Sequence, residues 1–341
     1  MRRHYLITGG AGFIGSNYAR RLLQRNEQVT IFDNLSRAGA PRNVAWLKEQ
    51  FGDDAFRLIV GDVRSAEAML HAAKDADVIV HLAGQVAVTT SITNPREDFE
   101  ANALGTFNAL EAARLSGRDP IFIYASTNKV YGGMENVALV EEPTRWRYRD
   151  LIHGCPETQP LDFHSPYGVS KGTGDQYTRD YARIYGLRSV VFRQSCIYGP
   201  RQFGIEDQGW VAWFIIAAVT GRPITIYGDG KQVRDVLFIE DLLDAYDAAI
   251  EKIDLAKGQI YNMGGGPANV MSVWAEFGPL LERLLGKKIE VARGDWRPGD
   301  QRVFYADIRK AERELGWKPK VSVEEGIEML FNWVKENREM F

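Results

Sequence analysis

Short apolar runs alternate with longer amphipathic segments over the first two thirds of the chain. The short runs are rich in Ile and Val and have the length of buried strands: 5–8, 29–33, 57–61, 78–82, 121–125 and 190–193. Between them, apolar residues recur three and four positions apart, as is typical of helices, in the segments 13–24, 66–73, 98–115 and 167–185. This alternation predicts an α/β fold in which crossover helices cover a doubly wound parallel sheet.

The pattern changes after Arg193, where Gly and Pro residues interrupt the chain at short intervals. We interpret this part as a smaller, loop-rich C-terminal domain that binds the substrate. A helical segment and a strand-like run at 259–262 lie within it, and we expect both to return to the first domain. The predicted division is therefore residues 1–195 plus about 236–263, and about 196–235 plus 264–341.

The first predicted strand runs into a glycine-rich turn that begins at Gly9 and is followed at once by a helix. Glycine permits a tight turn and lets backbone N–H groups approach a pyrophosphate at the positive end of a helix. The second strand ends in Asp33, whose carboxylate suits the hydroxyl groups of an adenosine ribose and repels a 2′-phosphate. The pattern predicts a dinucleotide site of the Rossmann type, and the alternative is a packing turn with an unrelated Asp.

Further predicted contacts with the cofactor lie at later strand ends. Asp62 is placed to accept from an adenine amino group, and small residues follow the fourth strand. Arg37 either accommodates a phosphate or stacks on adenine, and Asp33 favours NAD over NADP. The expected cofactor-binding residues are Gly9, Gly12, Phe13, Ile14, Gly15, Asp33, Asn34, Ser36, Arg37, Asp62, Val63, Leu82, Ala83, Gly84, Asn102, Tyr167 and Lys171.

Tyr167 and Lys171 are four residues apart at the start of a predicted helix, so they share one face. A lysine ammonium beside a phenol stabilises the phenolate and lowers the tyrosine pKa from about 10, which makes it usable as a base. A further strand end supplies Ser126 and Thr127, whose hydroxyl groups suit a substrate oxygen. We predict that Thr127, Tyr167 and Lys171 are catalytic; the alternative is a chance Tyr/Lys pair on an exposed helix.

Five motifs in order resemble those of the extended short-chain dehydrogenase/reductase family, which includes nucleotide-sugar epimerases and dehydratases. They are Thr8-Gly9-Gly10-Ala11-Gly12-Phe13-Ile14-Gly15, Val130-Tyr131-Gly132, Tyr167-x-x-x-Lys171, Ile197-Tyr198-Gly199-Pro200 and Arg297-Pro298-Gly299-Asp300. The resemblance implies an NAD-dependent enzyme and a homodimer or homotetramer.

Within that family, 4,6-dehydratases place an acidic pair directly after the catalytic hydroxyl, whereas this chain has Asn128 and Lys129 there. Elimination of water needs a proton-transferring carboxylate, so a dehydratase is disfavoured. Narrower motifs are similar to those of epimerases that invert C2 of a CDP-linked hexose, and Cys196 stands where 4-epimerases usually carry Asn. Two alternatives stay open: a UDP-glucose/galactose 4-epimerase, and a non-catalytic NAD-binding sensor.

The predicted substrate anchors combine arginines, which form bidentate bonds with phosphate oxygens, and polar side chains near the catalytic residues. Arg234 and Arg297 match pyrophosphate contacts of the family. A solvated surface charge is the alternative for any single arginine, and a structural hydrogen bond is the alternative for His164. The expected substrate-binding residues are Thr127, Asn128, His164, Arg201, Gln208, Arg234, Arg297 and Arg302.

Composition narrows the partners further. The chain of 341 residues carries 42 Lys and Arg against 45 Asp and Glu, a formal charge of −3, so no basic surface for nucleic acid or an anionic membrane is expected. The two cysteines, Cys155 and Cys196, form neither a disulfide framework nor a metal-binding cluster. With no signal peptide and no apolar run long enough to span a membrane, we expect a cytoplasmic protein without a bound metal.

Overall fold

The computed structural model describes residues 2–297 and 300–341. The chain folds into two compact units, the first made of Met1–Thr127, Ser165–Arg193 and Tyr246–Tyr261, and the second of Asn128–His164, Gln194–Ala245 and Asn262–Phe341. This differs from the predicted division, because 128–164 and 236–245 fold with the second unit. The segment that follows the catalytic strand therefore leaves the first unit and returns only at the helix that carries Tyr167.

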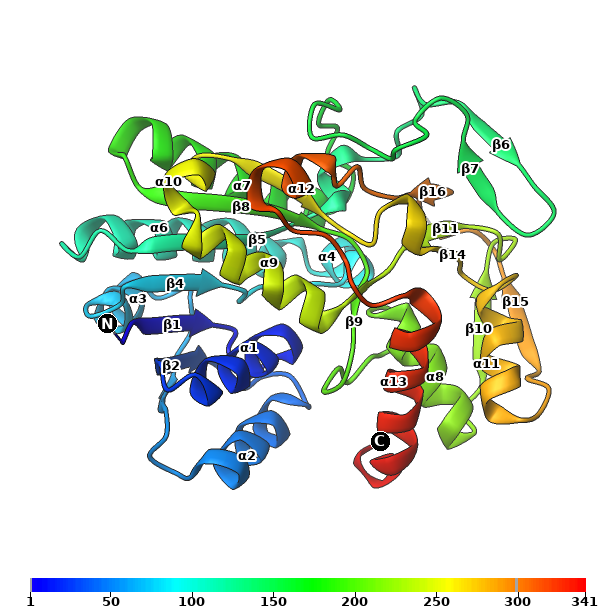
Figure 1. Ribbon diagram of the computed structural model, residues 1–341, viewed down its shortest axis with the longest axis horizontal. Coiled ribbons are helices and arrows are strands. Elements are labelled where there is room, and N and C mark those ends of the chain that lie inside the picture. The colour runs from blue at the N-terminus through cyan, green and yellow to red at the C-terminus, as the bar shows by residue number, and fades with distance from the viewer. Residues whose placement is uncertain (1, 298–299) are drawn as a thin grey trace. The chain divides into compact units, whose positions relative to one another are not determined.

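The first unit is built on a seven-stranded sheet in the order β13-β8-β5-β4-β1-β2-β3 (Figure 1). Strands β1 to β5 pair in parallel, and the chain moves outward in both directions from β1 and β4. The strands are β1 (His4–Thr8), β2 (Gln28–Asp33), β3 (Arg57–Val60), β4 (Val78–His81), β5 (Ile121–Thr127), β8 (Arg188–Gln194) and β13 (Ile260–Met263). The predicted strands are confirmed, with small displacements of their ends.

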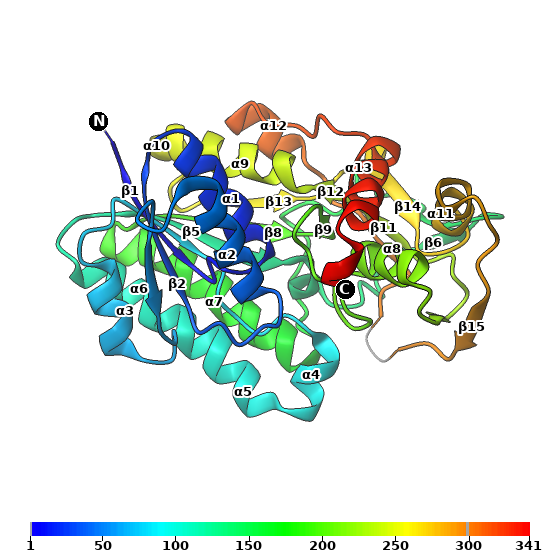
Figure 2. The ribbon, with the colours of Figure 1, turned by 90° about the horizontal axis from the view of Figure 1, so that it is seen from below.

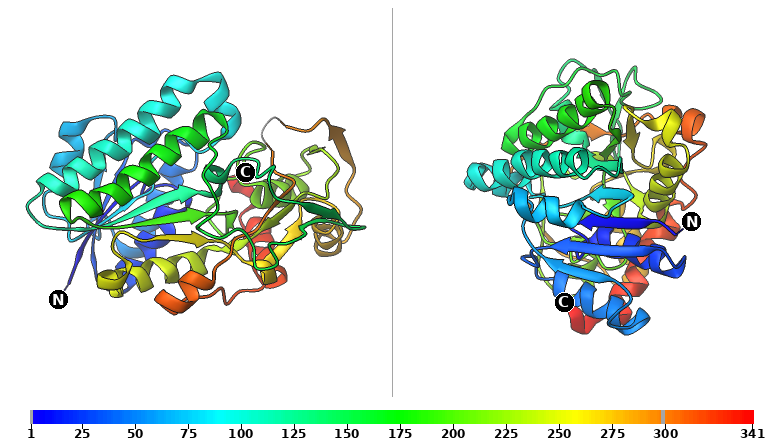
Figure 3. Two further views of the ribbon diagram at one scale, coloured as in Figure 1. Left: turned by 90° about the horizontal axis from the view of Figure 1, so that it is seen from above. Right: turned by 90° about the vertical axis from the view of Figure 1, so that its left-hand side faces the viewer.

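Helices cover both faces of this sheet, with α3, α6 and α7 on one face and α1 on the other (Figures 2 and 3). The predicted helices at 13–24 and 66–73 are confirmed, but the one expected at 98–115 contains a π turn, η1. The helix at 40–51 was not predicted. The helices are α1 (Phe13–Gln24), α2 (Ala40–Phe51), α3 (Ala66–Ala73), α4 (Val88–Thr93), α5 (Pro95–Phe99), η1 (Glu100–Leu104), α6 (Gly105–Leu115), α7 (Ser165–Tyr185), α9 (Ile239–Glu251) and α10 (Ile253–Ala256).

The core of the first unit fills both sides of the sheet. On one side, Leu6, Ile79 and Phe122 from adjacent strands pack with Leu110 of α6, and all four are fully buried. On the other side, the Phe192 ring of β8 stacks on the Tyr246 ring of α9 with centroids 5.4 Å apart. Burial on both faces explains why the strands are continuous apolar runs rather than alternating ones.

The second unit consists of short sheets and helices, as the Gly and Pro punctuation predicts. The sheets are β14-β11-β16, β10-β15, β12-β9 and β6-β7. Their strands are β6 (Leu139–Glu141), β7 (Trp146–Tyr148), β9 (Ile197–Tyr198), β10 (Ile224–Tyr227), β11 (Val233–Asp235), β12 (Leu237–Phe238), β14 (Val270–Ser272), β15 (Val291–Gly294) and β16 (Val303–Phe304). The helices are η2 (Asn128–Tyr131), α8 (Trp210–Thr220), η3 (Pro267–Asn269), α11 (Phe277–Leu285), α12 (Arg309–Leu315), α13 (Val323–Glu336) and η4 (Arg338–Met340).

A buried carboxylate holds the loops of the second unit together. Asp235, at the end of β11, is fully buried and accepts hydrogen bonds from the Ser195 hydroxyl at 2.7 Å and from the backbone nitrogens of Ala306 at 3.0 Å and Gly266 at 3.1 Å. Burial raises the pKa of Asp235 to about 6, while these hydrogen bonds oppose the rise. One side chain thus joins three segments that are distant in sequence.

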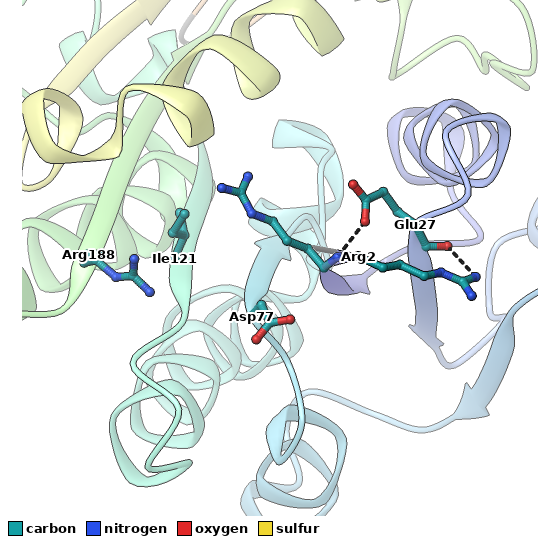
Figure 4. Close-up of a pocket in the computed structure, with 6 residues that line it drawn as sticks. Arg2, Glu27, Asp77, Ile121 and Arg188 are labelled. Carbon is teal, nitrogen blue, oxygen red and sulfur yellow. Dashed lines mark hydrogen bonds between the residues drawn. The ribbon is translucent and has the colours of Figure 1, made fainter.

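A hollow of about 400 Å³ lies at the amino ends of the strands in the first unit (Figure 4), lined by Arg2, Arg3, Glu27, Asp77, Ile121 and Arg188. The backbone nitrogen of Arg3 donates to the Glu27 carboxylate at 2.6 Å. Doubly wound sheets bind their ligands at the carboxyl ends of the strands, so this hollow lies at the opposite edge from the predicted site. Within the described ranges, no helix is long and apolar enough to cross a membrane.

An ion pair is buried in the first unit beneath α7. The guanidinium of Arg193 in β8 meets the Asp175 carboxylate of α7 through Nε at 2.9 Å and Nη2 at 2.9 Å, and the two side chains are 2% and 0% exposed. Burial of a charge is tolerated only when the charge is paired and hydrogen-bonded. Here both conditions hold.

We therefore expect Arg193→Met to reduce the free energy of unfolding by about 3–5 kcal/mol, because the Asp175 charge is left buried without a partner. Urea unfolding followed by circular dichroism measures the change. Lys48→Met is the matched control, since Lys48 pairs with Asp53 at 3.1 Å on the surface and its loss should cost about 0–1 kcal/mol. Equal effects of the two variants would contradict the assignment of a buried, energetically coupled pair.

Candidate functional site at the carboxyl ends of β1 and β4

Close backbone packing requires glycine in the turn after β1. Gly9 has a φ of +67°, and a Cβ there would lie 2.7 Å from the backbone nitrogen of Ala83. A Cβ on Gly15 would lie 2.5 Å from the Gly9 carbonyl oxygen. Gly12 caps α1, which begins with Phe13 and Ile14, and the first turn, all of it described, contains no acidic side chain. The positive end of α1 is thus open to an anion.

Asp33 ties the second strand to this turn. Its Oδ2 accepts a hydrogen bond from the backbone nitrogen of Ala11 at 3.0 Å, and its Oδ1 accepts one from Leu35 at 2.8 Å. Burial raises the pKa of Asp33, and the two hydrogen bonds and the charge of Arg37 oppose the rise. Each carboxylate oxygen can accept a second hydrogen bond, so the arrangement suits the two hydroxyl groups of a ribose.

Asp62 lies beside Asn34, whose Nδ2 donates to its Oδ2 at 3.3 Å. The backbone nitrogen of Ser36 donates in turn to Asn34 Oδ1 at 3.1 Å. The Arg64 guanidinium donates to both oxygens of Asp62, at 2.9 and 2.7 Å, and holds the pKa of Asp62 at about 2. The predicted adenine contact is therefore an ionised carboxylate already bonded to an arginine that the sequence analysis did not include.

The end of β4 is packed against the π turn η1. A Cβ on Gly84 would clash with the side-chain oxygen of Asn102. The Asn102 Nδ2 donates to Asp98 at 3.0 Å and to Ser170 at 3.1 Å, whereas its Oδ1 is buried and, among the described residues, has no hydrogen-bond partner. A buried acceptor without a partner beside a glycine is a suitable place for a hydrogen-bond donor of a ligand.

The structure brings the three predicted catalytic side chains together in the first unit. Thr127 ends β5, while Tyr167 and Lys171 lie one turn apart in α7, and each is less than one-tenth exposed. The Thr127 side chain is hydrogen-bonded to the Tyr167 hydroxyl. The other candidate hydroxyl, Ser126, instead donates to Asp175 at 2.7 Å. Thr127 is therefore the hydroxyl that shares the site with Tyr167.

Burial has the largest effect on the pKa values of Tyr167 and Lys171. It raises the pKa of Tyr167 to about 12, while the hydrogen bond from Thr127 lowers it and the charge of Asp98 raises it. Burial also lowers the pKa of Lys171 to about 8. The Lys171 ammonium lies over the ring of Tyr124, 4.5 Å from its centroid. The expectation that Lys171 lowers the Tyr167 pKa stays a prediction: in this structure burial is the largest effect and raises that pKa.

Sequence reasoning missed a hydrogen-bond chain behind the site. Thr8 Oγ1 accepts from the backbone nitrogen of Ala83 at 3.3 Å and bonds to His81 Nδ1 at 2.7 Å. His81 Nε2 bonds to Thr106 Oγ1 at 3.2 Å, and that hydroxyl donates to the Asn102 carbonyl at 2.5 Å. Burial lowers the pKa of His81 to about 3, so the ring is neutral and links the ends of β1 and β4 to the π turn.

The second unit brings two predicted substrate residues, Arg234 and Asn128, into one hydrogen-bonded group. The Arg234 guanidinium donates to Asp300 at 2.7 Å and to the carbonyl of Gln301 at 2.6 Å, and the Gln301 side chain accepts from Asn128 at 3.2 Å. Lys129, which was not predicted as a site residue, belongs to this group because the charges of Arg234 and Asp300 act on it. Burial and the Arg234 charge lower the pKa of Lys129 to about 8.

Other predicted anchors lie against aromatic rings of the second unit. Arg297 lies 4.0 Å from the centroid of Tyr227 and pairs with Asp207 at 3.2 Å, beside Gln208. Arg302 lies over the rings of two tryptophans, 4.9 and 5.4 Å from their centroids: Trp146 and Trp296. Arg201 lies 5.7 Å from the centroid of Trp333, and the exposed His164 lies 3.4 Å from Asp162. Pro298 and Gly299 of the last motif lie outside the described residues.

Solved structures of similar fold include enzymes that bind NAD. The chain superposes on dTDP-glucose 4,6-dehydratase from Streptomyces venezuelae, solved with NAD bound, with a TM-score of 0.85 and 30% identity over 100% of this chain and 99% of the other. It superposes on UDP-glucose 4-epimerase from Thermotoga maritima, solved with UDP-glucose, with a TM-score of 0.83 and 30% identity over 98% and 99% of the two chains. The open helix end, Asp33 and Asn102 fit NAD.

We expect Asp33→Asn to weaken NAD binding about tenfold, because charge-assisted hydrogen bonds to the ribose are replaced by weaker neutral ones. The preference for NAD over NADP should also fall, because the repulsion of a 2′-phosphate is lost. Isothermal titration calorimetry with both dinucleotides measures the two effects. Asp53→Asn, at a side chain that is 81% exposed, is the control. Unchanged NAD affinity in Asp33→Asn would place the ribose elsewhere.

Sequence comparison assigns the family. The family model described as GDP-mannose 4,6 dehydratase matches residues 6–330. CDP-paratose 2-epimerase from Salmonella typhi is 45% identical to this chain over 335 residues, which cover 96% of the chain and 98% of the relative. The chain therefore belongs to the GDP-mannose 4,6 dehydratase family of extended short-chain dehydrogenases/reductases and is an NAD-dependent enzyme.

Proposed function

We propose that this chain is a nucleotide-sugar epimerase that inverts C2 of a CDP-linked hexose through a transient 2-keto sugar. CDP-paratose is the proposed substrate and CDP-tyvelose the product, with CDP-glucose and CDP-mannose as the alternative pair. The hydrogen bond between Thr127 and Tyr167, one helical turn from Lys171, is the observation that carries the chemistry. The relative from Salmonella typhi, named for the same reaction, supports the choice of CDP and of C2.

In the proposed mechanism, Tyr167 removes the proton of the C2 hydroxyl while Thr127 holds the same oxygen by a hydrogen bond. When bound, NAD would supply reversible hydride acceptance for C2. The 2-keto sugar turns about its phosphate linkage and presents its other face, and Tyr167 then gives the proton back. No net oxidation results, so the anchored nucleotide has to keep the ketone in the site between the two half-reactions.

The pKa of Tyr167, about 12, means that a positive charge has to approach the phenol before it acts as a base near neutrality. Lys171 is the cation that the protein supplies, and its pKa of about 8 keeps it mostly protonated at neutral pH. The proposed role of Lys171 is therefore to stabilise the Tyr167 phenolate and to bind the ribose of the cofactor.

Two features favour an epimerase over a dehydratase. Asn128 and Lys129 follow Thr127, so neither of these positions supplies the carboxylate that elimination of water requires. Lys129 carries a positive charge at the second of these positions, which is the opposite of what a proton-accepting carboxylate would provide.

A UDP-sugar 4-epimerase is the second candidate, and the likeness to the enzyme from Thermotoga maritima supports it. It would use the same Thr127, Tyr167 and Lys171 but would present C4 of the sugar to the cofactor. The anchors proposed for the diphosphate, Arg234 and Arg297, would serve either nucleotide.

Tyr167→Phe should reduce kcat by several orders of magnitude, because the phenol oxygen that moves the proton is removed while the buried ring is kept. Turnover of the CDP-hexose followed by NMR measures the loss. Tyr185→Phe is the control on the same helix, because Tyr185 is 55% exposed, and it should retain normal turnover. Near-normal turnover of Tyr167→Phe with a bound cofactor would rule out the proposed base.

Incubation with CDP-paratose in deuterated water should give CDP-tyvelose without deuterium at C2, because the hydride leaves and returns within one enzyme molecule. NMR of the product identifies both the inverted carbon and the isotope. Conversion of UDP-galactose alone would favour the 4-epimerase. Tight NAD binding without turnover of any nucleotide sugar would favour a sensor.

A further inference from the structure

Asp98 is a buried carboxylate next to the catalytic residues that the mechanism above does not use. It lies in α5 and is fully buried. Its Oδ1 accepts hydrogen bonds from Asn102 Nδ2 and Gln85 Nε2, both at 3.0 Å, and its Oδ2 accepts one from the Ser170 hydroxyl at 2.6 Å. These three donors are neutral. They hold the carboxylate in place but do not balance its charge.

The other buried charges of the region identify the partner of Asp98. Asp175 also acts on Lys171, but its carboxylate is bound by the Arg193 guanidinium at 2.9 Å, so that pair adds little net charge. Among the described residues, the cation that acts on Asp98 is the ammonium of Lys171, which is only 7% exposed and directly follows Ser170 in the chain. Asp98 acts on both Lys171 and Tyr167.

We propose that Asp98 is a positioning residue whose buried negative charge balances the Lys171 ammonium, and which thereby sets the pH range of catalysis at Tyr167. The proposal rests on the proposed function for its effect on turnover. The balance of charge itself is a property of the fold and is tested separately below.

The sign of the effect is the same for both catalytic groups. A negative charge favours the protonated form of lysine and disfavours the phenolate, so Asp98 raises the pKa of Lys171 and that of Tyr167. The remaining ionisable groups packed there do not reverse this. His81 is neutral, burial raises the pKa of Tyr124 well above its usual value, and Asp175 stays paired with Arg193. Loss of the Asp98 charge should therefore lower both pKa values.

The substitution Asp98→Asn removes the charge and leaves the hydrogen bonds satisfiable. The amide oxygen can still accept from Asn102 and Gln85, while the amide nitrogen takes the place of Oδ2 and donates to the Ser170 oxygen. The Ser170 hydroxyl can then turn to the carbonyl of Tyr167, which lies 3.2 Å away. Ser170→Ala is the matched control, because it removes a hydrogen bond to Asp98 and keeps the charge.

The first test is the pH dependence of kcat of the NAD-loaded enzyme with the CDP-hexose. In Asp98→Asn, the acidic and the alkaline limbs should both move to lower pH by about one pH unit, and in Ser170→Ala neither limb should move. Displacement of the two limbs in opposite directions, no displacement, or the same displacement in Ser170→Ala would overturn the proposal.

The second test does not need turnover. If Asp98 and Lys171 balance each other, Lys171→Met leaves a buried carboxylate uncompensated, and the added substitution Asp98→Asn should relieve it. The double variant should therefore unfold at a higher urea concentration than Lys171→Met, and a lower one would overturn the proposal. If the variants show this rescue but the wild-type protein turns over no nucleotide sugar, only the proposed function is contradicted. If the wild-type protein turns over the sugar but the variants show no rescue, only the role of Asp98 is contradicted.

Discussion

The close approach of the turn after β1 to the end of β4 is the constraint on which the first unit depends. At Gly9 the backbone is in the left-handed region and lies so near Ala83 that no side chain fits between them. Below the contact, Thr8, neutral His81 and Thr106 connect the two strand ends to the carbonyl of Asn102. The glycine turn, the strand order and the π turn are therefore parts of one arrangement. The positive end of α1 lies where the strand order reverses, between β1 and β4.

A π turn interrupts the predicted helix at 98–115 where Asn102 packs against Gly84 after β4. One additional residue per turn changes which side chains face inward, and in η1 it brings the Asn102 amide onto Asp98 and Ser170. Hydrophobic periodicity averages over a whole segment and does not detect a single widened turn. The apolar spacing therefore predicts an amphipathic helix that begins at Asp98, and the distance of four residues places Asp98 and Asn102 on one face of it.

What the sequence predicted was set by local patterns. The apolar runs of the sheet, the glycine turn, Asp33 at a strand end and the placement of Tyr167 and Lys171 one turn apart in a helix follow from local patterns, and the structure has these elements as expected. What it missed depends on contacts between distant segments. The residues 128–164 fold with the second unit because Asn128 bonds to Gln301 and Cys155 bonds to Asn262 and Tyr305, and no pattern within the segment itself indicates this.

Burial and charge act against each other at the catalytic residues. Desolvation moves the pKa of Tyr167 up to about 12 and that of Lys171 down to about 8, and both changes disfavour the phenolate and ammonium that the chemistry needs. The negative charge of Asp98 raises both pKa values. It therefore favours the ammonium of Lys171 but disfavours the phenolate of Tyr167. At neutral pH the buried Lys171 is thus mostly protonated, while Tyr167, with a pKa of about 12, remains a phenol until a positive charge stabilises its phenolate.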